Sequence, residues 1–417
     1  MKSLSIALII DDKFPSSSGV SRSVQTQIEE LTRLSHKVTL LAPYDNLEVP
    51  RQAKTIPVNS FRLPGLPIHT RILYATNHTA KVISQQHHFN LVHSQTDTGA
   101  LLLAAKIARQ QHIPHIHTFH TNIAGSHTVP IPTFFASIGF RLYALNVAAI
   151  HKRRPQKHAK SKFTALLADE SRIGRFDWRT QAIIASAVDA STTPSHYMTN
   201  YIHAAASGEV SLSAIIPTGY NRIFEEYARV AQRQRRNKTV RFISISRLVK
   251  EKHLDCVIKA FQRAAIPNSE LLVVGDGAER KNLIRLAADT PNITFAGHVG
   301  DRKQIVQLLR DSDVFVLASY RFDNQPIVIP ESLVMGLPVL YCDDRLDVGL
   351  HNGTNSLLVQ PDEESLAQGM KKLASSTYRK KLSAGTKSVF KELSPEATAT
   401  AFVKLYQQAI TKYSRCK

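Results

Sequence analysis

Two carboxylates separated by seven residues, Asp323 and Glu331, mark the most informative segment of the chain, residues 320–343. Carboxylates accept strong hydrogen bonds from hydroxyl-rich ligands such as a sugar or a ribose. Backbone N–H groups between the two acids could meet phosphate oxygens where a helix begins. We expect Pro330 at the first position of that helix and Gly336 at its end. The alternative is a plain loop before a helix, with both acids in solvent.

Two basic residues lie five positions apart in the loop after another apolar run. They are Arg247 and Lys252 in SRLVKEKHLD, residues 246–255. Arginine supplies a planar fork of donors and lysine a mobile point charge, so the two could converge on one diphosphate. Two basic residues after a strand could equally lie at the solvent surface.

Histidines cluster at the end of a third apolar run, in HIHTFHT at residues 115–121. Ligands of open α/β sheets bind beyond the carboxyl ends of the strands, which favours a functional role for polar groups there. A neutral imidazole at His120 could donate a hydrogen bond to a sugar hydroxyl, while a core position is an equally good interpretation. The spacing of His117 and His120 would allow metal ligation, but no third ligand is evident, so no metal is expected.

Gly19 lies in FPSSSGVSRSV, residues 14–24, directly after the first apolar run. A glycine that opens a helix lets backbone N–H groups approach a phosphate, where the helix dipole favours the anion. One glycine is not the full dinucleotide-binding fingerprint, so a plain strand-to-helix turn is the commoner explanation.

These segments follow short apolar runs that alternate with amphipathic stretches along the chain. Continuous, β-branched or apolar runs are typical of buried parallel strands. The runs are 3–10, 37–42, 89–94 and 114–119 in the first half, and 240–246, 270–275, 292–297, 313–319 and 338–342 in the second. This alternation predicts doubly wound α/β sheets, and a length of 417 residues predicts two domains.

The domain boundaries follow from composition. We expect a first domain over 1–225 and a second over 239–394, with a linker in the polar, basic segment 221–238. A last helix, about 395–417, is expected to pack back on the first domain.

Charge and cysteine use limit the partners and the compartment. The net charge is +20, from 53 Lys and Arg against 33 Asp and Glu, which favours anionic partners. Three scattered cysteines without metal-ligand spacing indicate a reducing, cytoplasmic setting. The start of the chain is more like a first buried strand than a signal peptide.

The segment 134–162 departs from the alternation of strands and helices. Residues 134–150 are almost wholly apolar, and 151–162 carry six Lys or Arg and no acid. A transmembrane span is disfavoured by Arg141 near its centre. Two interpretations stay open: a buried helix followed by a solvated basic loop, or a helix in the membrane interface whose basic neighbours hold anionic headgroups.

Taken in order, these segments resemble the retaining GT-B glycosyltransferases of family 4, over nearly the whole chain. The shared elements are a glycine loop after the first strand, an HTYHT-like stretch, an Arg…Lys pair, and two acids seven residues apart. The turn VGDGAE at 274–279 and the run NSLLV at 355–359 match two further elements of the family. The order of these elements is specific, although no single element is.

The resemblance implies an α/β fold of two Rossmann-like domains facing across a cleft that holds the active site. Its implied activity is transfer of a hexose from a UDP or GDP sugar to a hydroxyl acceptor, with retention of configuration. The catalytic residues that it implies are His120, Asp323, Arg247 and Lys252. No cofactor and no catalytic metal are implied, because fixed positive charge stabilises the departing diphosphate.

The resemblance also implies a set of donor-binding residues. They are Gly19, Arg247, Lys252, Gly277, Glu279, His298, Val299, Asp323, Asn324, Gln325, Ile327, Val328 and Glu331. Glu331 would hold the ribose hydroxyls, whereas Glu279 is more simply explained as an acid at the start of a helix. Two departures leave the donor open: Asp323 stands where most relatives have glutamate, and Pro326 replaces a glycine and removes an N–H.

Several acceptors and two other activities are compatible with the sequence. A membrane glycolipid or diacylglycerol-type lipid is favoured by 134–162, with the enzyme peripheral on the inner face of the cell membrane. A soluble oligosaccharide or glycoside is the alternative acceptor. Nucleic-acid binding rests on charge alone, since no recognised motif is present, and a sugar-nucleotide epimerase would use the same fold.

Overall fold

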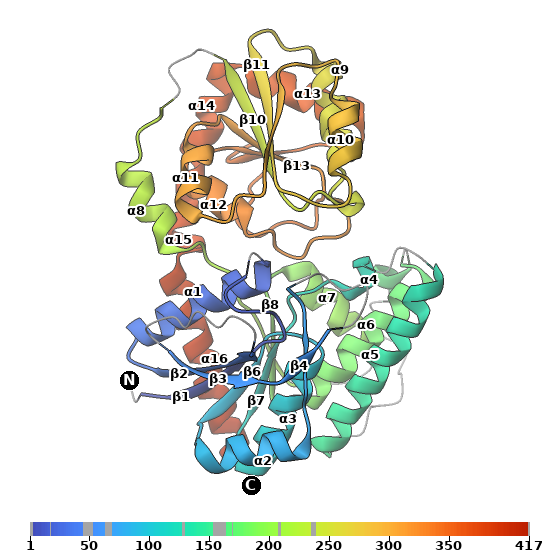
Figure 1. The fold of residues 1–417 in the computed structure, drawn as a ribbon, viewed down its shortest axis with the longest axis vertical. Helices are drawn as coiled ribbons and strands as arrows, with labels where there is room; N and C mark the ends of the chain where they lie inside the picture. Colours follow the sequence, from blue (N-terminus) through green and yellow to red (C-terminus); the bar gives the residue numbers. More distant parts are fainter. Residues whose placement is uncertain are drawn as a thin grey trace. The chain divides into compact units, whose positions relative to one another are not determined.

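The computed structural model describes residues 3–16, 18–44, 53–62, 69–126, 130–152, 164–168, 170–206, 210–234 and 239–415. The chain divides into two compact units (Figure 1). Unit 1 is Met1–Thr218 with Thr398–Lys417, and unit 2 is Gly219–Ala397. Each unit is a parallel sheet with helices on both faces, the doubly wound α/β arrangement that the sequence predicts.

The sheet of unit 1 has seven parallel strands in the order β3-β2-β1-β6-β7-β8-β9. Its strands are β1 (Ser5–Ile9), β2 (Lys37–Pro43), β3 (Lys54–Val58), β6 (Leu91–Ser94), β7 (His115–Thr118), β8 (Ala190–Thr193) and β9 (Leu212–Ile215). A small antiparallel pair, β4 (Ser60–Phe61) and β5 (Ile72–Leu73), forms a separate sheet. The strand order reverses between β1 and β6, and such switch points are where open α/β sheets bind ligands.

The helices of unit 1 cover both faces of this sheet. They are α1 (Gly19–Arg33), α2 (Asn77–Gln86), α3 (Gly99–Gln111), α4 (Ile123–Ser126), α5 (Pro130–Ile150), α6 (Arg172–Ala187), α7 (His196–Ala205) and α16 (Pro395–Arg415), with a 3₁₀ turn, η1 (Thr164–Leu167). Helix α16 buries Phe402 and Tyr406 against Ile6 and Leu8 of β1. The last helix of the chain is therefore part of the core of unit 1.

The sheet of unit 2 has six parallel strands in the order β12-β11-β10-β13-β14-β15. They are β10 (Val240–Ile245), β11 (Ser269–Val274), β12 (Ile293–Gly297), β13 (Val314–Leu317), β14 (Val339–Tyr341) and β15 (Ser356–Leu358). Its helices and 3₁₀ turns are α8 (Arg222–Val230), η2 (Lys250–Lys252), α9 (Leu254–Ala264), α10 (Arg280–Leu286), α11 (Arg302–Arg310), α12 (Val328–Val334), α13 (Glu363–Ala374), α14 (Ser376–Gly385), η3 (Thr386–Ser388) and α15 (Val389–Glu392). Strand β10 lies at the switch point, because its neighbours are β11 and β13.

Each apolar run that predicts a strand forms one. Strands β8 and β9 of unit 1 have no such signal. Strand β8, ASTT, is fully buried but made of small and polar residues, and β9 is only half-buried. Burial and pairing with neighbouring strands hold these segments in the sheet, so local composition does not reveal them.

Two boundaries differ from the predictions. Residues 219–225 fold with unit 2 rather than with the first domain, because Tyr220 and Phe224 are buried in its core. Part of the predicted linker is thus helix α8. Helix α12 begins at Val328, so Pro330 is its third residue and not its first. Its end is as predicted: Gly336 has a φ of +81°, which glycine adopts without strain.

Candidate active site

The basic loop and the acidic loop of unit 2 meet beyond the carboxyl ends of adjacent strands. Lys252 follows β10 and Asp323 follows β13, and these strands are paired in parallel. The Lys252 Nζ donates to Asp323 Oδ1 at 2.5 Å, and both side chains are largely buried. Lys252 Nζ also lies 5.2 Å from the centre of the Phe322 ring. Lys252 therefore lies next to the acidic segment, residues 320–331, as the predicted diphosphate site requires.

The acidic segment continues into helix α12. Asn324 is buried, while Gln325, Ile327 and Val328 are half-buried. Glu331, in the first turn of the helix, is only 2% exposed. A carboxylate at that depth is expensive to desolvate, so we expect a specific contact to offset the cost.

A carboxylate that the sequence prediction missed holds the acidic loop in place. Asp343, fully buried after β14, accepts hydrogen bonds from the Arg321 backbone N–H at 2.6 Å and from Arg345 Nε and Nη2 at 3.1 Å. Arg321 has a φ of +54°, a conformation that few non-glycine residues adopt. Asp343 thus fixes the turn two residues before Asp323. The only sequence signal was an acid directly after the run 338–342.

The turn after β11 supports the loop that carries Arg247 and Lys252. Leu248 N–H donates to Asp276 O, and Glu279 N–H donates to Leu248 O, both at 2.9 Å. Arg247 is exposed on this loop. Glu279 is the N-cap of helix α10, and its carboxylate accepts a hydrogen bond from Asn282 Nδ2, as expected of an acid at a helix start.

Gly277 allows the two loops to approach at backbone distance. A Cβ at this position would lie 2.4 Å from Leu248 O and 2.9 Å from Leu248 N. Gly277→Ala is therefore expected to displace the Arg247 loop, lowering both the melting temperature and turnover, with a stability cost of roughly 1–3 kcal/mol. Gly300→Ala is the control, since its Cβ would meet only His298 Nε2, at 3.6 Å. Equal melting temperatures and rates in the two variants would contradict this role.

His298 and Val299 follow β12, the edge strand of the sheet. His298 is exposed, and Val299 packs partly against the core that contains Phe315 and Val339. Both residues are at the same end of the sheet as Lys252, but separated from it by strand β11.

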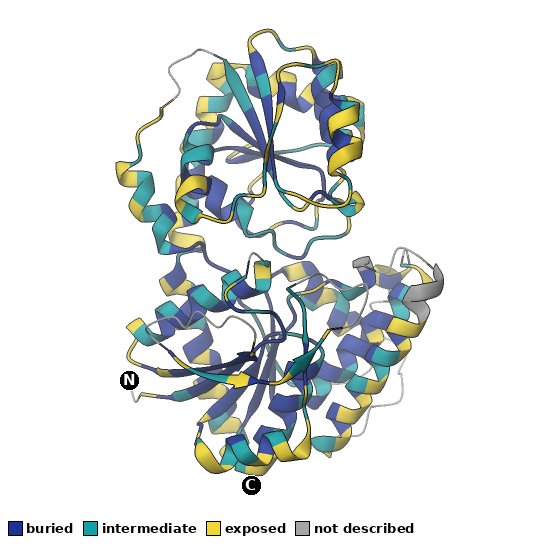
Figure 2. Ribbon diagram, viewed as in Figure 1, coloured by how far each residue is buried: buried dark blue, intermediate teal, exposed yellow. Residues whose placement is uncertain are grey.

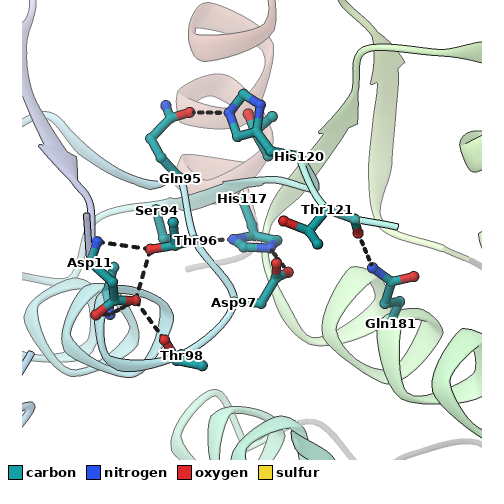
Figure 3. A network of polar contacts seen from close by, with 12 residues as sticks. Asp11, Ser94, Gln95, Thr96, Asp97, Thr98, His117, His120, Thr121 and Gln181 are labelled. Atoms are coloured by element: carbon teal, nitrogen blue, oxygen red, sulfur yellow. Dashed lines mark hydrogen bonds and ion pairs between the residues drawn. The ribbon is translucent and has the colours of Figure 1, made fainter. Parts of the chain in front are cut away.

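In unit 1, His120 lies just beyond the end of β7, two residues past Thr118. Its Nε2 is 2.8 Å from Gln95 Oε1, beyond the end of β6 (Figure 3). Burial, and secondarily the neighbouring His117, lower the pKa of His120 to about 3. The ring is therefore neutral at physiological pH, as a hydrogen-bonding role toward a sugar requires.

His117 is a core histidine. It is fully buried, with Nε2 3.1 Å from Asp97 Oδ1 and Nδ1 2.8 Å from Ser94 Oγ (Figure 3). Within the described ranges, no three or more His, Cys, Asp or Glu side chains are grouped so that they could hold a metal ion. The structure thus gives His117 and His120 different surroundings, although they are close in sequence.

Gly19 is the exposed first residue of α1. Ser18 caps this helix by accepting from Ser21 N–H at 3.0 Å, and its own hydroxyl donates to Asp12 Oδ2. The adjacent Asp11 is buried and accepts from Thr98 Oγ1, and burial raises its pKa (Figure 3). Asp11 and Asp12, which the sequence prediction did not single out, tie together the loops around the ends of β1 and β6.

Two family models match consecutive parts of the chain. The model "Glycosyltransferase Family 4" matches residues 17–222, and "Glycosyl transferases group 1" matches residues 228–389. The chain is a family 4 glycosyltransferase. The glycosyltransferase motifs that the sequence predicted, from Gly19 to Glu331, all lie within these matched ranges.

Curated relatives of this glycosyltransferase include two proteins named alpha-monoglucosyldiacylglycerol synthase. The protein from Acholeplasma laidlawii is 21% identical over 389 residues, covering 86% of this chain and 85% of the relative. The protein from Streptococcus pneumoniae is 33% identical over 120 residues, covering 28% of this chain and 26% of the relative.

Solved structures of the GT-B class share the fold of the glycosyltransferase. Anabaena HepE in complex with UDP and glucose is 15% identical, with a TM-score of 0.69 over 97% of this chain and all of that one. Sucrose-phosphate synthase from Thermosynechococcus elongatus is 18% identical, with a TM-score of 0.71 over 98% of this chain and all of that one. The predicted α/β, GT-B fold class is confirmed.

Proposed function

We propose that this glycosyltransferase moves a hexose from a UDP or GDP sugar to a hydroxyl of a membrane glycolipid or diacylglycerol-type lipid, with retention of configuration. The ion pair between Lys252 and Asp323 carries the proposal, because it brings together a cation that would bind phosphate and a carboxylate that would bind the sugar. The names of the two synthase relatives favour the lipid acceptor, and the HepE complex with UDP and glucose favours UDP as the nucleotide.

Unit 2 would bind the donor. Arg247 and Lys252 would stabilise the charge that develops on the departing diphosphate, with no reorganisation at the moment of bond cleavage. Asp323 would accept hydrogen bonds from the transferred hexose and Glu331 from the ribose. When a diphosphate binds, Lys252 would contact both the diphosphate and Asp323. Asp323 would keep the ammonium group of Lys252 oriented.

The remaining residues would shape the donor site. Gly277, Glu279, His298 and Val299 would border the nucleotide, and Asn324, Gln325, Ile327 and Val328 would border the sugar and phosphates. In unit 1, Gly19 and neutral His120 would contact donor or acceptor. Retention would follow from front-face attack, in which the leaving phosphate accepts the proton of the acceptor hydroxyl.

Transfer of labelled hexose into lipid tests the proposal. The purified protein is incubated with radiolabelled UDP-glucose or GDP-glucose and anionic vesicles that contain diacylglycerol, and the lipids are then extracted. We expect label in the lipid fraction with an α-linkage by NMR. Nucleotide release with labelled free hexose and no label in the lipid fraction would show that the donor is only hydrolysed, and would overturn the lipid part.

Helix α5 supports a peripheral membrane position. Exposed and buried residues alternate along this helix (Figure 2). The exposed ones include Phe135, Ile138, Leu142 and Leu145, which are 38–71% exposed, while Ala144 is buried. These four residues are spaced by three or four positions, so they form one apolar stripe. In the parts of the chain that the structure describes, no helix has the length and apolar character needed to cross a membrane.

The charges around α5 favour an anionic surface. Arg141 does not interrupt the apolar stripe, because its guanidinium donates to Thr180 Oγ1 and Phe176 O on α6. Helix α6 presents Arg172 and Arg179 as exposed cations beside α5. The basic residues 153–162 lie outside the described residues. We propose that α5 lies in the interface of an anionic membrane, with these arginines at the headgroups.

Leu142→Asp tests the membrane contact. Removing a 62% exposed leucine from the stripe and adding a negative charge is expected to weaken vesicle binding about tenfold or more, from lost apolar burial of roughly 1.5–3 kcal/mol. Co-sedimentation with anionic vesicles measures it. Leu34→Asp is the matched control, since Leu34 is exposed at the end of α1. Equal binding by both variants would remove α5 as the contact.

A further inference from the structure

One side-chain amide holds the imidazole of His120. Gln95 Oε1 lies 2.8 Å from His120 Nε2 (Figure 3). An amide oxygen can only accept, so His120 Nε2 must carry a hydrogen. Because the ring is neutral, its Nδ1 then carries a lone pair.

The opposite end of the Gln95 amide is also held. Its Nε2 donates to Gln27 Oε1 at 2.9 Å and lies 3.2 Å from His93 Nδ1. Gln27 Oε1 can only accept, and in this arrangement the Gln95 amide nitrogen faces Gln27 while the amide oxygen faces His120. Gln95 is only 1% exposed, so its amide group makes its hydrogen bonds to protein groups rather than to bulk water.

A third layer fixes Gln27. Gln27 Nε2 donates to Tyr406 Oη at 2.8 Å, and Tyr406 Oη lies 2.7 Å from His93 Nδ1. Burial raises the pKa of Tyr406. Because Tyr406 Oη accepts from Gln27 Nε2, its own hydrogen can be donated to His93 Nδ1. His93 Nε2 is then the donor to Thr118 Oγ1 at 2.7 Å. These contacts are all satisfied when His93 and His120 both carry hydrogen on Nε2.

We propose that Gln95 is a positioning residue that keeps His120 in the tautomer with hydrogen on Nε2, and that Gln27 and Tyr406 of α16 hold Gln95 in the required orientation. This inference rests on the proposed role of His120. A ligand hydroxyl that meets this ring would act as the donor, with Nδ1 as the acceptor. A glutamate at position 95 could not replace the amide, because its second oxygen would face Gln27 Oε1 and the His93 lone pair.

The tautomer can be measured directly in the full-length protein. Two-dimensional NMR of histidine-labelled protein distinguishes protonated from unprotonated ring nitrogens, and His120→Ala assigns the His120 signals by their loss. We expect hydrogen on Nε2 in the wild type and a mixture of tautomers in Gln95→Leu. Hydrogen on Nδ1 in the wild type, or an unchanged His120 in Gln95→Leu, would overturn the inference.

Kinetics provide the second readout, with UDP-glucose and diacylglycerol-containing anionic vesicles. Gln95→Leu is expected to lower kcat about tenfold with little change in KM for UDP-glucose, the signature of lost transition-state interaction. Tyr406→Phe keeps the packed ring and is expected to show a smaller loss of the same kind. Gln95→Asn, which keeps an amide, should recover part of the tautomer preference.

The failures of this inference and of the proposed function are distinguishable. If His120→Ala retains wild-type kcat, the role of His120 fails. If His120→Ala is inactive while Gln95→Leu and Tyr406→Phe keep wild-type kcat, only the positioning role of Gln95 fails. If Gln95→Leu does not fold, Tyr406→Phe and the wild-type tautomer still decide the outcome.

Discussion

Lys252→Met is expected to lower kcat by roughly 10²–10³-fold, the loss seen when one preorganised group that stabilises developing negative charge is removed. Lys252 is held by Asp323 at 2.5 Å and is only 11% exposed, so its charge is oriented before the donor binds. The methionine side chain keeps most of the volume and removes the charge. Turnover of labelled UDP-glucose, with melting curves, measures the effect.

Lys250→Met is the matched control for this experiment. Lys250 belongs to the same 3₁₀ turn but is exposed, so its loss should leave kcat within about twofold, the usual range for surface substitutions. Adding Asp323→Asn to Lys252→Met should cost less than Asp323→Asn alone, since the two residues act as a pair. Wild-type kcat in Lys252→Met would remove this residue from the reaction.

Asp323→Ala and Glu331→Ala are each expected to lower turnover by more than about tenfold, or about 1.4 kcal/mol of transition-state stabilisation. Both carboxylates would lose strong hydrogen bonds to the donor. Glu331→Gln separates charge from volume, because Glu331 is buried and alanine would leave a cavity. Initial rates over a range of UDP-glucose concentrations provide the measurement.

Asp344→Ala is the control for both acids, since Asp344 is exposed and lies one residue after Asp343. We expect it to retain wild-type turnover and melting temperature. If Asp323→Ala and Glu331→Ala also retained wild-type rates, the assignment of the acidic segment as the donor site would be wrong.

The alternation of strands and helices was predictable because buried parallel strands are continuous apolar runs. Strand β8 was not, because ASTT is buried through its neighbours and not through its own hydrophobicity. Lys252 approaches Asp323 because β10 pairs with β13, although two strands, β11 and β12, lie between them in the sequence. Periodicity does not determine strand order, so the resemblance to a family supplied that part of the prediction.

The residues that support the site were harder to predict. In the sequence, Asp343 is not distinguishable from any other acid that follows a strand. Its burial and its hydrogen bond from the Arg321 N–H show that it holds the acidic loop. The contacts around Gln95 join positions far apart: Gln27 and Tyr406 are separated by 379 residues. Local patterns carry no information at that range, whereas the strand-end position of His120 was visible in the sequence.

Helix α16 affects the order in which the two units can be completed during synthesis. Unit 1 takes residues from both ends of the chain, and unit 2 is inserted between them, with its first and last segments joined where Tyr220 N–H donates to Leu393 O. During synthesis, every residue of unit 2 is therefore available before the core around Ile6 and Tyr406 can close. Unit 2 can therefore fold while unit 1, although most of it is synthesised earlier, still lacks α16 in its core.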